Sequence, residues 1–599
     1  MNDPEFFAKV LDTLTANGYV AKEAAAKVAA EMQRGIPFYS ALGQAKVNPK
    51  GIRAVLEEVA GVGALDPTLM TIDQELLADM ASLLSPHVII RDRIFPTKIE
   101  LNALQVVMHN PLDRELIGDL EALSGCRVSP QVCHDEALTD IIEKSFKSAL
   151  QSLPPKFHQE TPQAIRKAVF ESRKKQPLQD YVDRAEKWIN VNKEKMVSDP
   201  EALKVVIRHP AVIQLVHQVL TRLVYQGCSD VHFEPLENEY RIRARIDGAM
   251  RTVASLPTNF KLPITARLKV MAGLPPAPAR MPQDSQINYN VIFGKMIEFR
   301  FSALPSILGE KIVVRVLDRS RQSLPLNAIF PKDDEATVSR VIHSPNGLIL
   351  VTGPTGSGKT MTLYAVLAEL NKVDVNIVTA ENPVESKVAG ITQVQCDPDT
   401  EGAVGFGDAL RSFLRQDPDI IMVGEIRDQE TAEISLKAAL TGHLVLSTLH
   451  TNDAAASIMR LTNMKLDPFL IAAALRMVIA QRLVRLLCKE CKVPVPRAES
   501  AYGKILETFP KLDGEKLTIY KKGTGCATCE KTGYKGRRGI FEVLVVSPAV
   551  QELIIKEQPI TEIVKQLRSE GMASLFDSGL AFVAQGVTSF EEVMRVAAA

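Results

Sequence analysis

The sequence predicts a multidomain protein of the α/β class, and three observations support this prediction. The chain has 599 residues, which at roughly 150 residues per domain corresponds to about four domains. Residues 488–529 hold two Cys-x-x-Cys pairs, which indicate a small insert. Between residues 340 and 480, helical patterns alternate with apolar runs in the order of a parallel sheet, and these runs are Gly347–Thr352, Ile377–Ala380, Ile420–Val423 and Leu444–Thr448.

The composition is that of a globular protein, with 46% hydrophobic and 24% charged residues. Lys and Arg total 71, and so do Asp and Glu, so net charge indicates neither nucleic-acid binding nor attraction to a membrane. The start MNDPEFF lacks the basic residues and apolar core of a signal peptide, and no run approaches 18 apolar residues. We therefore expect a cytoplasmic protein that does not bind nucleic acid.

The first third of the chain shows three kinds of pattern. Residues 1–60 keep a helical period. Residues 75–148 predict a mixed α/β region, with short strands at Val88–Ile90 and Leu104–Val107. The polar, basic segment 150–200 indicates a linker with an exposed helix, although a solvated helix at a domain edge fits equally well.

The next region predicts a helix followed by antiparallel strands. An amphipathic helix is expected from Pro210 to about Gln226. Strands follow at Asp230–Glu234 and Tyr240–Ile246, the second ending in an Asp-Gly turn, and residues 297–317 predict two more strands. The last 50 residues of the chain look helical.

A phosphate-binding loop lies between an apolar strand and a helical run. The segment GPTGSGKT fits the pattern G-x-x-x-x-G-K-[ST] without departure. Backbone N–H groups of such a loop close around phosphate, Lys359 would contact the outer phosphates, and Thr360 would contact Mg²⁺. The predicted nucleotide-binding residues are Gly353, Pro354, Thr355, Gly356, Ser357, Gly358, Lys359, Thr360 and Met361.

The two cysteine pairs predict a structural metal site. Four thiolates can hold one tetrahedral Zn²⁺, and the 34-residue interval between the pairs has room for a small helix at about 497–510. Redox-active pairs are the alternative. The adjoining basic stretch Arg476–Lys492 is predicted to be helical, either touching lipid headgroups or supporting the metal site. The predicted ligands are Cys488, Cys491, Cys526 and Cys529.

Four boxes occur in order: GPTGSGKT (353–360), TAENPVE (379–385), DPDIIMVGEIRD (417–428) and TGHLVLSTLHTND (441–453). Together they resemble the secretion NTPases of type II secretion and type IV pilus assembly, and the resemblance covers about residues 75–599. It implies a RecA-like P-loop NTPase core, a PAS-like α+β second N-terminal domain, a mixed α/β N-terminal docking domain and a tetracysteine zinc insert. The implied parts are a helical module (1–70), the docking domain (75–150), a linker (151–205), the arginine-bearing second domain (206–325), the ATPase core (326–487), the zinc module (488–535) and a helical C-terminal region (536–599).

The resemblance also assigns acidic and histidine residues. Glu385 matches the catalytic glutamate that activates water, with Glu381 as the lesser candidate. Glu425, after an apolar strand, matches the Walker B glutamate, which would hold Mg²⁺ through water or polarise the attacking water. His443 and His450 match histidines thought to sense the γ-phosphate and couple subunits; a buried core position is the alternative for each.

Four arginines match the family, and one residue of the acidic box differs from the family pattern. Arg280 and Arg300 match arginines that swing over the nucleotide, where guanidinium groups suit phosphate oxygens; surface ion pairs are the alternative. Arg315 and Arg427 are weaker candidates of the same type. Asn382 stands where the family usually has Asp, and we expect activity to survive because Glu385, Glu425 and Glu381 remain.

The resemblance predicts a hexameric, Mg²⁺-dependent ATPase recruited to the inner face of the inner membrane. It would drive pilus or pseudopilus assembly through an inner-membrane platform protein and a cytoplasmic docking partner, and the sequence does not distinguish the two systems. The helical N-terminal module is related more weakly to modules that bind cyclic-di-GMP, and docking is preferred for it. Alternatives are a retraction or DNA-transport ATPase, against which the cysteine module and long N-terminal region speak, and an ATP-binding regulatory scaffold with weak hydrolysis.

Overall fold

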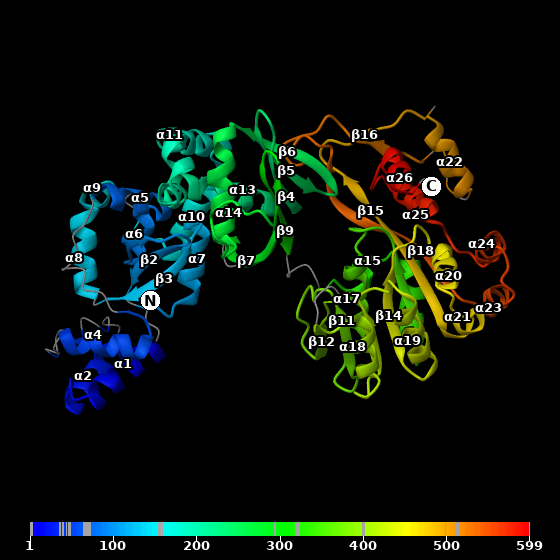
Figure 1. Ribbon diagram of the computed structural model, residues 1–599, viewed down its shortest axis with the longest axis horizontal. Helices are drawn as coiled ribbons and strands as arrows, with labels where there is room; N and C mark the ends of the chain where they lie inside the picture. The colour runs from blue at the N-terminus through cyan, green and yellow to red at the C-terminus, as the bar shows by residue number, and fades with distance from the viewer. Residues whose placement is uncertain are drawn as a thin grey trace. The chain divides into compact units, whose positions relative to one another are not determined.

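The computed structural model divides into two units, Met1–Leu317 and Asp318–Ala599 (Figure 1). It describes residues 4–597 except 35–37, 39–40, 43–44, 46–48, 64–73, 109, 134, 154–156, 158–159, 293–294, 318–323, 398–401, 498, 511, 513 and 515. Within these ranges, no helix combines the length and the apolar character needed to cross a lipid bilayer.

The N-terminal segment is helical where it is described, as predicted for residues 1–60; residues 1–3, 35–37, 39–40, 43–44 and 46–48 lie outside the described residues. Helices α1 (Pro4–Ala16), α2 (Lys22–Gln33) and α4 (Pro49–Ala60) share a small core in which Phe7 and Leu56 are buried, and Val132 from the following region also enters it.

A three-stranded sheet follows, formed by β1 (Phe95–Ile99), β2 (Ala103–Met108) and β3 (Arg127–Val132). It is surrounded by α5 (Gln74–Leu84), α6 (Pro86–Asp92), α7 (Arg114–Ser124), α8 (Asp135–Ser145) and α9 (Lys147–Gln151). The strand predicted at Leu104–Val107 is confirmed. The strand predicted at Val88–Ile90 is wrong, because these residues lie in α6, which begins at Pro86 and buries Val88 and Ile89. Burial of the apolar face outweighs the strand preference of the β-branched residues.

The predicted linker, 151–205, is mostly folded helix. Helices α10 (Pro162–Lys175), α11 (Leu178–Ser198) and α12 (Pro200–Arg208) each bury an apolar stripe. Arg166 of α10 is buried and donates to Asp119 at 2.8 Å and Asp92 at 2.5 Å. The linker assignment is therefore wrong for these helices: most of their residues are polar, and the narrow buried stripes are easily overlooked.

The rest of the first unit is a six-stranded antiparallel sheet, in the order β6-β5-β4-β9-β8-β7, with two helices. Asp247 and Gly248 make the predicted turn with φ of 50° and 80°, as a tight hairpin requires. The predicted helix and strands are confirmed, although α13 is buried nearly all round. The elements are α13 (Pro210–Tyr225), β4 (Cys228–Pro235), β5 (Tyr240–Ile246), β6 (Ala249–Leu256), η3 (Thr258–Phe260), α14 (Lys261–Met271), β7 (Gln283–Ile292), β8 (Lys295–Ser306) and β9 (Gly309–Leu317).

The second unit is built on a seven-stranded sheet in the order β12-β11-β13-β14-β10-β15-β18 (Figure 1). The pairs are parallel except β15 with β18, so all four predicted apolar runs are confirmed as parallel strands. One strand, β14, separates β10 from β13. The strands are β10 (Gly347–Thr352), β11 (Ile377–Glu381), β12 (Ile391–Gln395), β13 (Ile420–Val423), β14 (Leu444–Leu449), β15 (Leu475–Leu487) and β18 (Tyr534–Val545).

Helices cover both faces of this sheet, so its strands are buried on both sides. In β10, Leu348 and Leu350 enter one core while Ile349 and Val351 enter the other. The predicted C-terminal helices are confirmed. The helices are α15 (Leu326–Ile329), α16 (Lys332–Ile342), α17 (Lys359–Leu370), α18 (Phe406–Phe413), α19 (Gln429–Leu440), α20 (Ala454–Asn463), α21 (Pro468–Ala474), α23 (Pro548–Ile555), α24 (Ile560–Ser569), α25 (Leu575–Ala584) and α26 (Phe590–Ala597).

The helix predicted at Arg476–Lys492 is wrong, because most of this stretch is strand β15. Met477 and Ile479 face one core, and Val478 and Ala480 face the other. A strand buried on both faces reads as a continuous apolar run, which periodicity alone does not distinguish from a buried helix.

Glu592 of α26 anchors the C-terminal helix to β15. It is 1% exposed and accepts hydrogen bonds from Arg485 and Arg595, each at 2.6 Å. Burial alone would raise its pKa, but these arginines outweigh burial and hold the pKa at about 2. A lowered carboxyl pKa contributes stability above the unfolded value, about 4.3, that is lost as pH falls toward 2.

We therefore expect Glu592→Gln to cost up to about 3 kcal/mol at pH 7, at about 1.4 kcal/mol per pKa unit. The difference in melting temperature between wild type and variant should shrink as pH falls from 5 to 2.5. A difference that stays constant over that range would contradict the ion-pair role. Glu591→Gln, at an exposed position on the same helix, is the control for the lost charge.

Candidate nucleotide site and metal centre

The phosphate loop joins β10 to α17, and its glycines permit close packing against β15. Gly353, Gly356 and Gly358 have φ of 146°, 79° and 93°. A Cβ at Gly353 would lie 2.5 Å from the Gln481 carbonyl oxygen, and one at Gly358 would lie 2.8 Å from the Gln481 side chain. Both positions therefore require glycine, and the sequence motif is matched by the backbone geometry.

The polar groups of this loop suit an anion. Lys359 Nζ donates to the carbonyl oxygens of Gly353 and Pro354 at 2.7 and 3.3 Å. Burial lowers its pKa, and the charge of Glu425 acts in the opposite direction. Ser357 Oγ is buried and has no hydrogen-bond partner among the described residues. Phosphate oxygens would satisfy both groups. Exposed neighbours are Pro354, Thr355, Gly356 and Thr360, whereas Met361 is half-buried.

Glu425 follows β13 and is the centre of a charged cluster. Arg427 Nη2 lies 2.6 Å from its Oε1 and His450 Nε2 lies 3.5 Å from its Oε2. Lys359 also interacts with Glu425 electrostatically. The structure therefore brings together Lys359, Glu425, which is the predicted Walker B glutamate, His450 and the weaker candidate Arg427.

His443 does not join this cluster within one chain. It lies just before β14, and His450 lies just after it. Its Nδ1 is 3.0 Å from the Ala438 carbonyl oxygen, and its own carbonyl accepts from Gly347 at the start of β10. The parallel register of β10 and β14 thus places His443 at the edge of the sheet opposite the phosphate loop.

Glu381 is the last residue of β11 and is fully engaged by neutral donors. It is 4% exposed. Its Oε2 accepts from Tyr364 Oη at 2.6 Å, and its Oε1 accepts from Thr379 Oγ1 at 2.6 Å and Gln393 Nε2 at 3.0 Å. These bonds fix the carboxylate inside the protein, which favours a positioning role over contact with substrate.

Glu385 lies in the loop between β11 and β12, half-buried, and its neighbours are held on both sides. Val384 N–H donates to Gln395 Oε1 at 2.8 Å. The Ser386 carbonyl accepts from Gln393 at 2.8 Å and from Tyr364 at 3.3 Å. We name Tyr364, Glu381, Gln393 and Gln395 the Glu385 brace. Tyr364, Gln393 and Gln395 are not among the residues predicted from the sequence, although the alternating glutamines of β12 are a signal that a polar edge strand faces a site.

The arginines of the first unit lie on its antiparallel sheet and on the loop before it. Cross-strand pairing places Arg300, Arg315, Asp230 and Arg245 in one row. Arg315 Nε donates to Asp230 Oδ1 at 2.9 Å, and Arg245 Nε lies 3.6 Å from Asp230 Oδ2. Burial would raise the pKa of Asp230, but hydrogen bonds from Arg315 and Ser229 lower it. Arg315, the weaker candidate, is thus held in an ion pair. The surface ion pairs considered as the alternative for Arg280 and Arg300 are not found among the described residues.

The four cysteines converge. Their sulfur atoms all lie within 4.8 Å of one another. Cys488 and Cys526 are 3.7 Å apart, as are Cys491 and Cys529, and backbone N–H groups of Cys526 and Gly533 point at Cys529 Sγ at 3.2 Å. A Cβ at Gly523 would lie 1.7 Å from the Cys491 carbonyl oxygen, so the turn requires glycine. The interval holds α22 (Ser500–Thr508), as predicted, and two short strands, β16 (Val493–Pro494) and β17 (Tyr520–Lys521).

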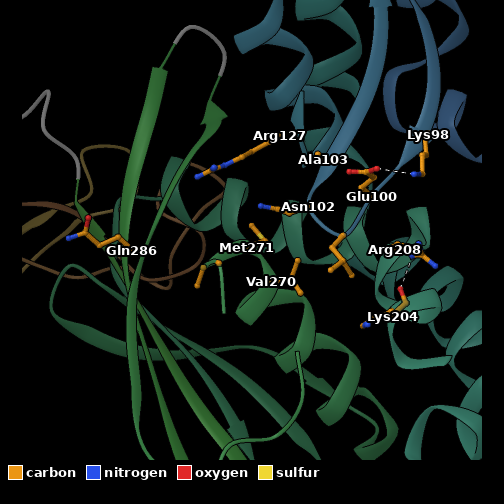
Figure 2. A pocket seen from close by; sticks show the side chains of 13 residues that line it. Lys98, Glu100, Asn102, Ala103, Arg127, Lys204, Arg208, Val270, Met271 and Gln286 are labelled. Atoms are coloured by element: carbon orange, nitrogen blue, oxygen red, sulfur yellow. Dashed lines mark hydrogen bonds and ion pairs between the residues drawn. The ribbon is translucent and has the colours of Figure 1, made fainter. Parts of the chain in front are cut away.

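A separate hollow of about 630 Å³ lies in the first unit (Figure 2). Arg127, Asn102 and Gln286 border it over an apolar floor that includes Val270 and Met271. No residue of the predicted nucleotide or metal site lines it. Two of the cations that line it are already engaged, because Lys98 pairs with Glu100 at 2.9 Å and Lys204 pairs with Glu201 at 2.6 Å.

The second unit therefore combines three features. Its phosphate loop has a backbone that requires glycine, Lys359 lies at the N-terminus of the helix after the loop, and Glu425 follows β13, which is separated from β10 by one strand. This arrangement defines a P-loop NTPase. The family model of the type II/IV secretion system proteins matches residues 208–595, and that of the MshEN domain matches residues 60–152. The chain belongs to the type II/IV secretion system protein family.

Sequence relatives support this assignment. The chain is 38% identical over 603 residues to the type IV pilus assembly ATPase PilB of Pseudomonas aeruginosa, with 100% of each chain covered. It is 39% identical over 529 residues to the protein of that name in Myxococcus xanthus, covering 88% of each. It is 45% identical over 386 residues to the type II secretion system ATPase E of Vibrio cholerae, covering 64% of this chain and 75% of the relative. The MshEN match falls mainly on the predicted docking domain.

Proposed function

We propose that the chain is a hexameric, Mg²⁺-dependent ATPase that powers assembly of type IV pili or type II secretion pseudopili through an inner-membrane platform protein. The proposal that the chain hydrolyses ATP is supported by one observation: Lys359, Glu425 and the braced Glu385 loop lie at the same edge of the sheet. Gly424 N–H donates to the Ala380 carbonyl at 2.8 Å, so the segments bearing Glu425 and Glu385 leave adjacent strands side by side.

In this proposal each group has a separate task. Lys359 exchanges its loop carbonyls for phosphate oxygens, and Ser357 and the loop N–H groups complete the cradle. Mg²⁺, held by Thr360 and through water by Glu425, would neutralise charge on the β- and γ-phosphates. Glu385 orients the attacking water and accepts its proton. Arg280 and Arg300 supply positive charge toward the γ-phosphate, while His450 senses it through Glu425.

The regions outside the nucleotide site also receive proposed roles. The antiparallel sheet with α13 and α14 would be the PAS-like second N-terminal domain (206–325), and the three-stranded lobe (75–150) would dock on a cytoplasmic partner at the inner face of the inner membrane. The four sulfurs offer the tetrahedral donor set that Zn²⁺ prefers. Cyclic-di-GMP is a lesser candidate ligand for the N-terminal region, with docking preferred.

The weakly hydrolysing scaffold is less well supported. Asn382 is exposed, and none of the hydrogen bonds that hold Glu381 involves it. The brace around Glu385 therefore does not depend on the aspartate that this chain lacks. We expect Asn382→Asp to change the turnover number less than threefold.

Lys359→Ala tests the proposed function directly. We expect Mg²⁺-ATPase activity to fall at least about 100-fold, because the charge on the outer phosphates is lost. Lys372→Ala, an exposed lysine just after α17, is the matched control. Activity that survives in the Lys359 variant would contradict the proposal, and so would a particle mass by light scattering that excludes a hexamer in the presence of nucleotide.

Gln393→Leu tests the brace. Loss of the amide frees the Ser386 carbonyl and leaves Glu381 with one donor fewer, so Glu385 is held less firmly. We expect kcat to fall about 10-fold with KM for ATP changed less than twofold, the pattern of a lost transition-state interaction. Thr392→Val, the exposed neighbour on β12, should leave both values unchanged. A rise in KM alone would place Gln393 in nucleotide binding instead.

A further inference from the structure

The loop between α14 and β7 carries Arg280 near its C-terminal end. Arg280 is exposed, and among the described residues no hydrogen bond or ion pair holds its guanidinium. The preceding residues read Leu-Pro-Pro-Ala-Pro-Ala, with prolines at 275, 276 and 278. Proline restricts φ and has no N–H, so the loop is stiff but has few donors with which to fasten itself to the protein.

A buried ion pair lies directly beneath this loop. Lys269 of α14 has a side chain that is 0% exposed, Glu310 of β9 has one that is 6% exposed, and their closest atoms are 3.1 Å apart. Burying two charges costs free energy that the attraction between them often only balances, so such a pair adds little stability by itself. An ion pair at this position therefore calls for another explanation.

Both members of the pair fasten the proline loop. Lys269 Nζ donates to the Ala277 carbonyl oxygen at 2.5 Å, and Ala279 N–H donates to Glu310 Oε1 at 3.3 Å. Ala279 immediately precedes Arg280. The stem is fixed as well, since Leu274 N–H donates to the Lys269 carbonyl at 2.8 Å. The charged pair thus satisfies a carbonyl and an N–H that an apolar pair could not.

We propose that Lys269 and Glu310 are positioning residues that, with the proline loop, hold Arg280 in the place from which it acts on the nucleotide phosphates. This inference rests on the proposed function, in which Arg280 supplies charge toward the γ-phosphate. Neither residue contacts the nucleotide; each acts through the backbone on either side of Pro278. Fixing the base of a long side chain in advance reduces the ordering needed when charge develops in the transition state.

The test uses the full-length chain and the paired replacement Lys269→Met/Glu310→Leu, which keeps an apolar contact and leaves no unpaired charge. Such replacements are often neutral for stability, so we expect an unchanged melting temperature but a kcat about 10-fold lower, with KM for ATP within twofold. Arg280→Ala should lower kcat at least as much. The combined Arg280→Ala/Lys269→Met/Glu310→Leu variant should be no slower than Arg280→Ala, because the pair acts through Arg280.

Pro276→Gly/Pro278→Gly makes the loop more flexible and leaves the buried ion pair unchanged. This variant tests the positioning role of the loop if the paired replacement does not fold. It too should lower kcat, while the melting temperature falls by only a few degrees, as expected for the greater freedom of the unfolded chain. If Arg280→Ala keeps wild-type kcat, the role of Arg280 in the proposed function fails. If Arg280→Ala is slow but the paired and the proline variants are both as fast as wild type, the positioning inference is overturned. A combined variant much slower than Arg280→Ala overturns it as well.

Discussion

Glu385→Gln is expected to lower kcat for ATP hydrolysis by about 10²- to 10⁴-fold, the range typical of a lost general base. The substitution keeps the size and hydrogen-bonding shape of the side chain but cannot accept a proton. Binding of ATP should change less than threefold, because the phosphate loop and Lys359 are untouched. Steady-state hydrolysis and equilibrium binding of a fluorescent nucleotide, measured on the same preparation, separate these two effects.

Glu381→Gln and Glu369→Gln are the controls for that result. Glu381 is buried among three neutral donors, so its amide variant should retain part of the brace and lose about 10-fold in kcat. Glu369 is exposed on α17 and should be silent. The assignment of the general base would move from Glu385 to Glu381 if Glu381→Gln were the slower enzyme of the two.

Much of the second unit could be predicted because its signals are local. The phosphate loop needs particular residues at fixed spacing, and the strand before it and the helix after it are both short-range patterns. The four buried strands are apolar throughout because helices cover both faces of the sheet. Such features do not depend on distant parts of the chain.

The errors arose where long-range contacts decide the local structure. Residues 88–90 prefer strand, yet they form a helix because α6 packs its apolar face on the three-stranded lobe. Residues 475–487 resemble a basic helix, yet pairing with both β10 and β18 makes them strand. The predicted linker, 151–205, instead contains packed helices, in which the buried Arg166 pairs with Asp92 and Asp119 from distant parts of the sequence.

The same distinction applies to the candidate site. Lys359, Glu425 and the cysteines belong to motifs, and the structure brings the members of each together. The brace could not be predicted, since Tyr364 and Gln393 lie on different elements and meet only in the folded sheet. His443 shows the converse: its motif is intact, but β14 separates it from His450 in the same chain.

Cys526→Ser is expected to abolish stoichiometric zinc binding and to unfold the module between residues 488 and 533. Structural Zn²⁺ in small motifs contributes roughly 10 kcal/mol or more of binding free energy that is also folding free energy. The module has few regular elements: α22 and the two-residue strands β16 and β17 are its only ones among the described residues. Its remaining support is packing onto the main core, by side chains such as Tyr502 and Ile505. Metal content by mass spectrometry should fall from about one Zn²⁺ per chain, as a tetracysteine site predicts, to near zero.

The ATPase core should survive this loss. The module is inserted between β15 and β18, which pair along most of their length, from Met477 with Val545 to Leu487 with Tyr534. Unfolding of the insert should therefore break only the β15–β18 pairs nearest to it. Limited proteolysis should then cut within 489–533, and the melting temperature of the ATPase core should shift by a few degrees. Thr528→Ser, an exposed position inside the same Cys-x-x-Cys turn, is the matched control. Retention of zinc by Cys526→Ser, or continued protease resistance of the metal-free variant, would show that packing rather than metal holds the module.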